Sequence, residues 1–323
     1  MLKVRCQRGN ALDNGWFKID KFAAGYPNER RMLRDEFQRH RNAALCSLDD
    51  KENAICYAGS EEYNNGKAVD RLLITGTSLC TGWLASADNH LVTNQHCIDD
   101  VTDAANTDYE FMAEAPNCGD ENRQLWYRGD IYSSATLIQT NSNLDYALVQ
   151  ITVGDPASKY SFLELDNRDA VVGEQVYIPQ HPGGRAKELA VVDGGQLCKV
   201  ASTTSGACTG YGYNDVRYYC DTEGGSSGSP VLARNSNKVL ALHHCGPCPN
   251  LGVPIDLIYA EIGEYLTAEC FQDSDCVDRD VCTSDICNAG VCQHPNITPC
   301  CGNGACETGE DFENCIEDCP APD

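Results

Sequence analysis

The cysteine content restricts the possible folds of this chain more than any other feature. Its 323 residues include 21 cysteines. Thiols in such number indicate an oxidising compartment, where they pair as disulfides. A zinc-rich intracellular protein would need several Cys-x-x-Cys pairs, and only Cys245 and Cys248 show that spacing. We therefore expect disulfides, no metal site in the body, and a secreted protein, although the opening residues contain no apolar signal-peptide core.

The distribution of charge, cysteine and apolar residues divides the chain into three regions. Residues 1–41 form a basic lead segment, in which residues 28–42 predict a helix that either docks on the acidic body or extends from it into solvent. Residues 42–268 form the body. Residues 269–323 contain ten cysteines and few large apolar groups. Disulfides must hold this module together, as two units at 270–300 and 301–319.

The net charge of −24 narrows the classes of partner. An acidic body does not offer the basic surface that phosphate contacts need, so nucleic acid is not expected. No apolar run is long enough to span a membrane. Acidic clusters in the C-terminal module are candidate calcium ligands, with solubilising charge as the alternative and surface or matrix contact as an open role. The clusters are Asp273, Asp275, Asp278 and Asp280, and Glu310, Asp311 and Glu313.

Short β-rich runs between turn residues predict an all-β body. Gly, Asn, Asp and Pro separate these runs, as they do in small barrels and sandwiches. A helix over residues 254–266 is expected to close the body. The runs occupy residues 71–75, 82–86, 90–94, 134–140, 146–153, 174–179, 187–192, 229–233 and 237–244.

Three motifs supply the residue types of a serine-nucleophile site. LVTNQHC contains His96, NLDYALVQI contains Asp145, and GGSSGSPV surrounds Ser227 with glycines. A serine hydroxyl needs a base within hydrogen-bond reach. His96 is the candidate base, and Asp145 is expected to fix its tautomer and stabilise its charged form. The backbone N–H groups of Gly225 and Ser227 are expected to hold an oxyanion, because a Cβ at the glycine would crowd that approach.

These motifs, in the order His, Asp, Ser, resemble those of the trypsin-like (chymotrypsin-fold) serine peptidases. GGSSGSPV, VLALHHCG and YIPQHPGGRAKEL are similar to segments of the bacterial glutamyl and lysyl endopeptidases. The resemblance implies two six-stranded antiparallel β-barrels with the active site between them, and a secreted endopeptidase that needs no cofactor for catalysis. Ser226 stands where trypsin has the aspartate that pairs with its newly freed N-terminus, so that mode of activation is not expected.

The resemblance also implies several disulfides. One is Cys80–Cys97, beside His96. A second is Cys56–Cys118, and Cys46 is expected to pair with Cys245 or Cys248, which leaves four body cysteines for two further bridges. Removal of residues 1–41 takes away Cys6 and leaves an even number of cysteines, so we expect processing of a propeptide at or near Arg41.

The Cys245-Gly-Pro-Cys248 sequence copies a redox motif. That motif needs a helix N-terminus to lower its thiol pKa, whereas this one follows a predicted strand. A stapled turn bordering the substrate cleft is therefore the favoured interpretation.

The sequence gives conflicting indications of the preferred substrate residue. Asp221 lies six residues before Ser227, and the resemblance to trypsin implies an acid at the floor of the primary pocket that favours Arg or Lys. Thr222 and His243 instead resemble the residues with which glutamyl endopeptidases recognise a carboxylate. We expect cleavage after basic residues, with cleavage after Glu as the alternative.

Two functions of other classes compete with the peptidase hypothesis. One is a non-catalytic secreted binding or adhesion protein on a protease scaffold, and the complete set of His96, Asp145 and Ser227 argues against it. The other is an esterase that uses the same triad, which the His, Asp, Ser order disfavours because α/β-hydrolases run Ser, Asp, His.

Overall fold

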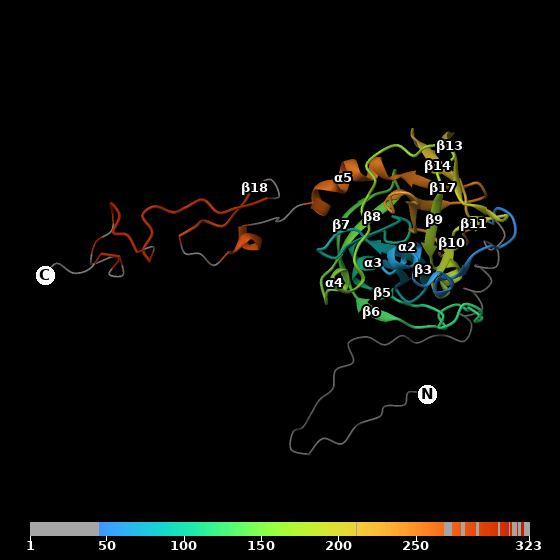
Figure 1. Ribbon diagram of the computed structural model, residues 1–323, viewed down its shortest axis with the longest axis horizontal. Helices are drawn as coiled ribbons and strands as arrows, with labels where there is room; N and C mark the ends of the chain where they lie inside the picture. Colours follow the sequence, from blue (N-terminus) through green and yellow to red (C-terminus); the bar gives the residue numbers. More distant parts are fainter. Residues whose placement is uncertain are drawn as a thin grey trace, which may run out of the picture.

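The computed structural model describes residues 45–210, 212–267, 273–278, 282–288, 291–302, 304–309, 311, 315 and 318–319. The lead segment, its expected helix over 28–42 and the expected processing site at Arg41 lie outside this range. The body consists of two antiparallel sheets, which Figure 1 shows packed into one β-rich unit.

The first sheet has seven strands in the order β6-β5-β2-β3-β4-β8-β7. Its central strands are almost fully buried, with Trp83, Leu84 and Leu91 inaccessible to solvent. In that order the strands are Asp130–Ser133, Thr107–Phe111, Val69–Ile74, Ser78–Leu84, His90–Thr93, Tyr146–Ile151 and Ala135–Asn141.

The second sheet has eight strands in the order β1-β10-β9-β15-β16-β17-β14-β13. An isolated bridge between Gln175 and Lys199 brings its β9 and β13 sides together, as expected for a sheet that curls toward a barrel. In that order the strands are Glu52–Asn53, Glu188–Ala190, Val176–Gln180, Pro230–Ala233, Val239–Cys245, Asn250–Pro254, Asn214–Tyr219 and Lys199–Gly206.

Helices are few and short. The longest, α5 (Ile255–Thr267), closes the body as predicted and hydrogen-bonds the first sheet, since Glu261 accepts from Tyr146 Oη at 2.6 Å. The remaining elements of the body are α2 (Glu61–Gly66), α3 (Val101–Ala105), α4 (Pro156–Tyr160), the 3-10 turns η1 (Ala54–Tyr57) and η2 (Pro182–Gly184), and the small hairpin β11 (Val192–Asp193) and β12 (Gln196–Leu197).

The trypsin-like double-barrel architecture expected from the sequence is confirmed, with two curled antiparallel sheets. The sheets hold seven and eight strands rather than six each. The two-residue strand β1 at the edge of the second sheet accounts for part of this difference, because the segment after Cys46 runs along the body and pairs with β10. The sequence patterns also missed β5, β6, β13, β14 and β17, whose runs carry Asp, Asn, Gly or Ser among the apolar residues.

Five disulfides join described cysteines of the body. Cys80–Cys97 and Cys56–Cys118 form as expected, and Cys46 takes Cys248 of its two candidates. Cys245 pairs instead with Cys208. The two cysteines of the CGPC sequence therefore enter different bridges, which makes this segment a stapled turn and not a redox pair. The fifth bridge is Cys198–Cys220.

The described parts of the C-terminal module contain little regular structure beyond η3 (Asp273–Cys276) and the hairpin β18 (Ile286–Asn288) and β19 (Val291–Gln293). Disulfides cross-link it, as its composition predicted: Cys276–Cys292, Cys282–Cys300, Cys301–Cys315 and Cys306–Cys319.

The expected calcium ligands fall partly outside the described residues. Asp280, Glu310 and Glu313 lie outside them, as does the side chain of Asp275. Two described carboxylates make contacts inside the module. Asp273 Oδ1 accepts from Cys287 N at 2.8 Å, and Asp278 Oδ2 lies 3.1 Å from His294 Nδ1. In the described part of the chain, no helix is long and apolar enough to cross a membrane.

The two sheets approach each other closely at Gly228, which follows Ser227. Its φ of +85° lies in the region that favours glycine. A Cβ there would overlap Thr81 O and Thr93 Oγ1 of the first sheet. Replacement of Gly228 by any other residue is therefore opposed by both backbone conformation and space.

We predict that Gly228→Ala lowers the free energy of unfolding by at least about 3 kcal/mol, as large steric and backbone defects do. Gly76→Ala is the matched control, since Gly76 has a φ of +74° but open space around a Cβ. It is expected to lower stability by only about 1 kcal/mol. Urea unfolding measures both changes, and equal losses would contradict the close approach of the sheets.

Candidate active site

Ser227 lies in the tight turn between β14 and β15, at the junction of the two sheets. Gly225 and Gly228 flank it with φ values of +96° and +85°. Gly225 packs against the η2 turn, where a Cβ would lie 2.9 Å from His181 O and 3.0 Å from Gly184 N. The half-buried Ser227 is thus presented by a backbone path that the neighbouring glycines permit.

The backbone amides of Gly225 and Ser227 are available to a ligand. Within the described residues, neither N–H donates a hydrogen bond. The turn is held through its other groups: Ser226 N donates to Glu223 O and Gly228 N donates to His243 O. The arrangement leaves the two donors that the sequence assigned to an oxyanion without a protein acceptor.

Thr81, on β3, holds this turn from the first sheet, and the sequence motifs did not reveal it. Its N–H donates to Ser227 O at 2.9 Å and its hydroxyl donates to Gly225 O at 2.9 Å. The same hydroxyl accepts from His181 N at 3.0 Å. Thr81 is fully buried, so these bonds are shielded from water. Thr81 therefore holds both residues of the expected oxyanion site, Gly225 through its side chain and Ser227 through its backbone N–H.

His96 and Asp145 contact each other as the sequence predicted. Asp145 Oδ2 lies 2.8 Å from His96 Nδ1, and Oδ1 accepts from the His96 backbone N–H at 3.0 Å. Asn94 Nδ2 also donates to Asp145 O at 2.9 Å. The carboxylate thus contacts both the ring and the backbone N–H of His96, and the two contacts together orient the imidazole. In this orientation Nδ1 carries the proton toward Asp145, which leaves Nε2 as the basic nitrogen.

Asp145 occupies a strained and strongly charged position. It ends the turn from β7 to β8 with a φ of +46°, in the left-handed region that few non-glycine residues adopt. Burial raises the pKa of its carboxyl, but hydrogen bonds from His244 and His96 outweigh burial and hold the pKa well below its usual value. Asp145 is therefore ionised at neutral pH.

Ser227 and His96 come from different sheets, and no hydrogen bond joins them in the described structure. The side chain of His96 is 45% exposed. Catalytic hydrogen bonds are often long before a substrate binds, so this geometry is compatible with a nucleophile and base pair.

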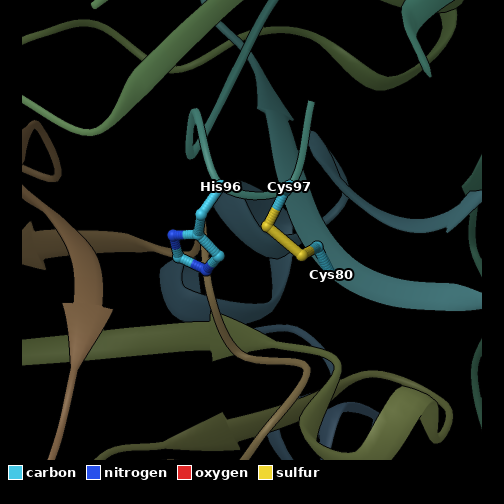
Figure 2. A group of neighbouring side chains, drawn as sticks. All are labelled: Cys80, His96 and Cys97. Atoms are coloured by element: carbon cyan, nitrogen blue, oxygen red, sulfur yellow. A yellow bond between two sulfur atoms is a disulfide. The ribbon is translucent and has the colours of Figure 1, made fainter. Parts of the chain in front are cut away.

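A disulfide fixes the loop that carries His96. Figure 2 shows His96 next to Cys97, whose sulfur is bonded to that of Cys80 on β3. The two sulfurs and the imidazole lie near one another. Because both cysteines are oxidised, they are not the thiolates that a metal would need. The group therefore positions the histidine loop.

His244, on β16, is a further group at this site that the motifs did not single out. Its Nδ1 lies 3.3 Å from Asp145 Oδ2, and its Nε2 lies 3.2 Å from Asp215 Oδ1. The side chains of His244 and Asp215 are fully buried. The only sequence signal was its place beside His243 in the strand that follows the nucleophile motif.

Asp221 is buried, but its carboxylate faces the segment that follows Cys46. Oδ1 accepts from Cys46 N at 2.7 Å and Oδ2 accepts from Asp50 N at 2.9 Å. Burial raises the pKa of this carboxyl, and the two backbone donors oppose that effect. Both oxygens of the expected specificity acid are thus already hydrogen-bonded inside the protein.

Thr222 and His243 have polar atoms with hydrogen-bonding capacity that the described residues do not use. Thr222 is fully buried, and its Oγ1 has no hydrogen-bond partner among the described residues. His243 Nδ1 lies 2.6 Å from Tyr218 Oη. Burial lowers the pKa of His243 to about 3, so the ring is neutral at neutral pH. Tyr218 Oη also lies 3.2 Å from Leu251 O. When its proton is directed to His243 Nδ1 and not to this carbonyl, the single ring proton of His243 resides on Nε2.

Ser226 supports the nucleophile turn without a charged partner. Its hydroxyl donates to Gln180 Oε1 and accepts from Glu223 N at 3.1 Å. Gln180 Nε2 in turn donates to Asp221 O at 2.8 Å. This neutral network occupies the place where the resemblance to trypsin locates an aspartate and an N-terminal ammonium.

Two curled β-sheets with a histidine, an aspartate and a serine at their junction define a protein of the trypsin-fold protease class. Residues 80–242 match the model of the trypsin-like peptidase domain. The chain belongs to this family.

Similarity to individual proteins covers part of the chain. It is 43% identical over 215 residues to Secreted RxLR effector protein 73 of Plasmopara viticola, a match that covers 65% of this chain and 52% of that protein. It is 24% identical over 206 residues to a glutamyl endopeptidase of Bacillus licheniformis, covering 60% and 58% respectively. The chain thus spans little more than half the length of these relatives.

Similarity to solved structures is more distant. The crystal structure of Deg5 has a TM-score of 0.47 at 13% identity, covering 66% of this chain and 92% of Deg5. An inactive form of the Rv3671c protease has a TM-score of 0.46 at 16% identity, covering 69% and 99%.

We predict that Thr81→Val weakens the nucleophile turn. The variant leaves Gly225 O and His181 N without their hydroxyl partner, and we expect a loss of about 2 kcal/mol in stability. Thr81→Ser is the control, because it keeps the hydroxyl. Labelling of Ser227 by a fluorophosphonate should be about tenfold slower in Thr81→Val than in Thr81→Ser, by analogy with the loss of one positioning contact. Equal labelling rates would show that Thr81 does not fix the turn.

Proposed function

We propose that this protein is an active serine endopeptidase, with Ser227 as nucleophile, His96 as general base and Asp145 as the residue that orients His96. The observations that carry the proposal are the uncommitted N–H groups of Gly225 and Ser227 and the contact of His96 with a buried carboxylate. A retired binding scaffold has no physical need for this combination.

The proposed reaction proceeds through an acyl-enzyme. His96 Nε2 takes the Ser227 proton as Oγ attacks the substrate carbonyl, and the two backbone N–H groups bind the oxygen as it becomes negative. His96 then gives its proton to the leaving amine. Water deacylates Ser227 by the same route. Side chains and backbone of the protein supply each step, so no cofactor is required.

We infer that the preferred residue on the amino side of the cleaved bond is acidic. The sequence favoured a basic residue through Asp221, but both oxygens of Asp221 accept hydrogen bonds from the segment after Cys46. A substrate carboxylate matches the buried Thr222 hydroxyl and an Nε2 proton on His243 better. The 24% identical relative is a glutamyl endopeptidase, which adds support.

Secretion and processing belong to the same proposal. Nine disulfides join described cysteines, and the 43% identical relative bears the name of a secreted effector. Both favour an extracellular protein. We propose peptides and proteins as substrates, removal of the lead segment near Arg41 as the maturation step, and contact with a surface or matrix as the role of the C-terminal module.

The peptidase proposal predicts that a fluorophosphonate labels Ser227 and abolishes casein hydrolysis. Ser227→Ala should neither react nor cleave, with casein turnover lowered at least about 1,000-fold. A melting temperature within about 2 °C of wild type would show that the fold persists, as expected for a polar substitution of this size. Labelling at another residue, or no casein cleavage by the unlabelled protein although Ser227 reacts with the reagent, would contradict the proposal. The second outcome would favour a binding protein, and ester turnover without peptide turnover would favour an esterase.

The specificity proposal predicts faster cleavage after Glu than after Gln, Arg or Lys in otherwise identical peptides, by about 100-fold in kcat/KM. Thr222→Val should lower the value for Glu at least about tenfold, because it removes one donor. Asp221→Asn should leave the order of preference unchanged. Cleavage only after Arg or Lys, lost in Asp221→Asn, would restore the basic-residue alternative.

A further inference from the structure

Two buried carboxylates face opposite nitrogens of one buried histidine behind the candidate triad. His244 Nδ1 lies 3.3 Å from Asp145 Oδ2, and its Nε2 lies 3.2 Å from Asp215 Oδ1. Asp215 is itself fixed, since Oδ2 accepts from Cys208 N at 2.6 Å, and Cys208 is bonded to Cys245, the neighbour of His244. The geometry of all three groups is therefore set by strands and a disulfide.

The chemistry of imidazole determines the charge of this group. A neutral ring carries one N–H and can donate toward one carboxylate only, whereas an imidazolium donates toward both. Either neutral tautomer would direct a lone pair at a buried negative oxygen. The imidazolium avoids this repulsion and leaves the three groups with one net negative charge. That is the charge that Asp145 alone contributes in a simple triad.

We propose that His244, held by Asp215, is a positioning residue whose charged form fixes the Asp145 carboxylate in the orientation that His96 requires. Asp145 Oδ2 receives both His96 Nδ1 and His244 Nδ1. Rotation of the carboxylate would leave a buried imidazolium poorly paired, which is strongly unfavourable. The proposal rests on the peptidase function proposed above and assigns a second histidine to that site.

The other groups around His244 do not titrate in the same pH range. Burial lowers the pKa of the adjacent His243 to about 3, and burial with the charges of Asp215 and Asp145 raises the pKa of Tyr213 to about 12. Burial also raises the pKa of Tyr218 well above its usual value. Burial lowers the pKa of His244, but Asp145 and Asp215 outweigh burial and raise it to about 9. His96 is the remaining titratable neighbour, through their shared contact with Asp145.

The raised pKa of His244 determines how the stability of the protein changes with pH. Folding raises the pKa of His244 from 6.5 to about 9. Its pairing therefore contributes stability that is complete below pH 6.5 and is lost as the pH rises through about 9. Loss of the same proton releases one of the two carboxylates, so kcat should fall over that range in the wild-type protein.

Asp215→Asn is the decisive variant, because it keeps an acceptor for Cys208 N while its amide donates to His244 Nε2. This fixes a neutral ring with the proton on Nδ1, facing Asp145. We expect kcat at pH 7 within about tenfold of wild type, since the donor to Asp145 is kept. We also expect the fall of kcat near pH 9, and the matching fall in melting temperature, to disappear. An alkaline fall unchanged in Asp215→Asn, or a wild-type profile that is flat to pH 10, would overturn the proposal.

Two matched variants at position 244 distinguish a positioning role of His244 from a packing role. His244→Asn keeps an N–H donor near the position of Nδ1, whereas His244→Leu does not. Both variants also carry Asp215→Asn, which avoids a buried unpaired charge. Relative to Asp215→Asn alone, the Leu variant should lose about 100-fold in kcat with little change in KM. The Asn variant should retain most of that kcat. Equal kcat values in the two variants would overturn the positioning role.

Failure of the peptidase function is distinguishable from failure of this proposal. If the wild-type protein cleaves no peptide, the function is wrong, but the pH dependence of its melting temperature still tests the charge of His244. A melting temperature with the same pH dependence in wild type and Asp215→Asn would overturn the charged pairing in either case.

Discussion

The contact between Thr81 and the nucleophile turn is the constraint on which the rest of the site depends. Ser227 belongs to the second sheet and His96 to the first, so the two meet only if the sheets keep a fixed relative position. Thr81 supplies that link with hydrogen bonds to the backbone of Gly225 and Ser227. Gly228 permits the close approach, because its backbone touches the same strand. A larger residue at position 228 would push the two strands apart and so separate Ser227 from His96.

Electrostatics at the junction follow from the same close packing. A buried carboxylate is unfavourable unless donors surround it. Asp145 has donors from the partly exposed His96 and the buried His244, and these lower its pKa despite burial. Asp215 then balances the second histidine. The site therefore consists of alternating acids and bases whose charges are mutually dependent, rather than of three isolated residues.

Disulfides stabilise the body and the C-terminal module in different ways. In the body they fasten loops to a core that is already well packed: Cys80–Cys97 holds the histidine loop, and Cys46–Cys248 fastens the segment that covers Asp221. In the module, the described residues include few buried apolar side chains apart from cysteines. Cross-links there take the place of a core. The segment that Cys46–Cys248 fastens supplies the backbone donors to both carboxylate oxygens of Asp221.

The amino-acid sequence alone was enough to predict the fold class and to single out Ser227 as the candidate nucleophile and His96 as the candidate base, because these depend on local patterns. Alternating strands, a glycine turn around Ser227 and a cysteine next to His96 are legible within a few residues. Tertiary structure alone decided what Asp221 contacts, that Thr81 holds the oxyanion turn, and that His244 pairs with Asp145 and Asp215. Residues 46 and 221, or 81 and 225, are brought together by sheet packing and a distant disulfide, and no local pattern encodes such contacts. Local sequence patterns thus indicate which residue types could react, while residues far away in sequence set the environment of each group.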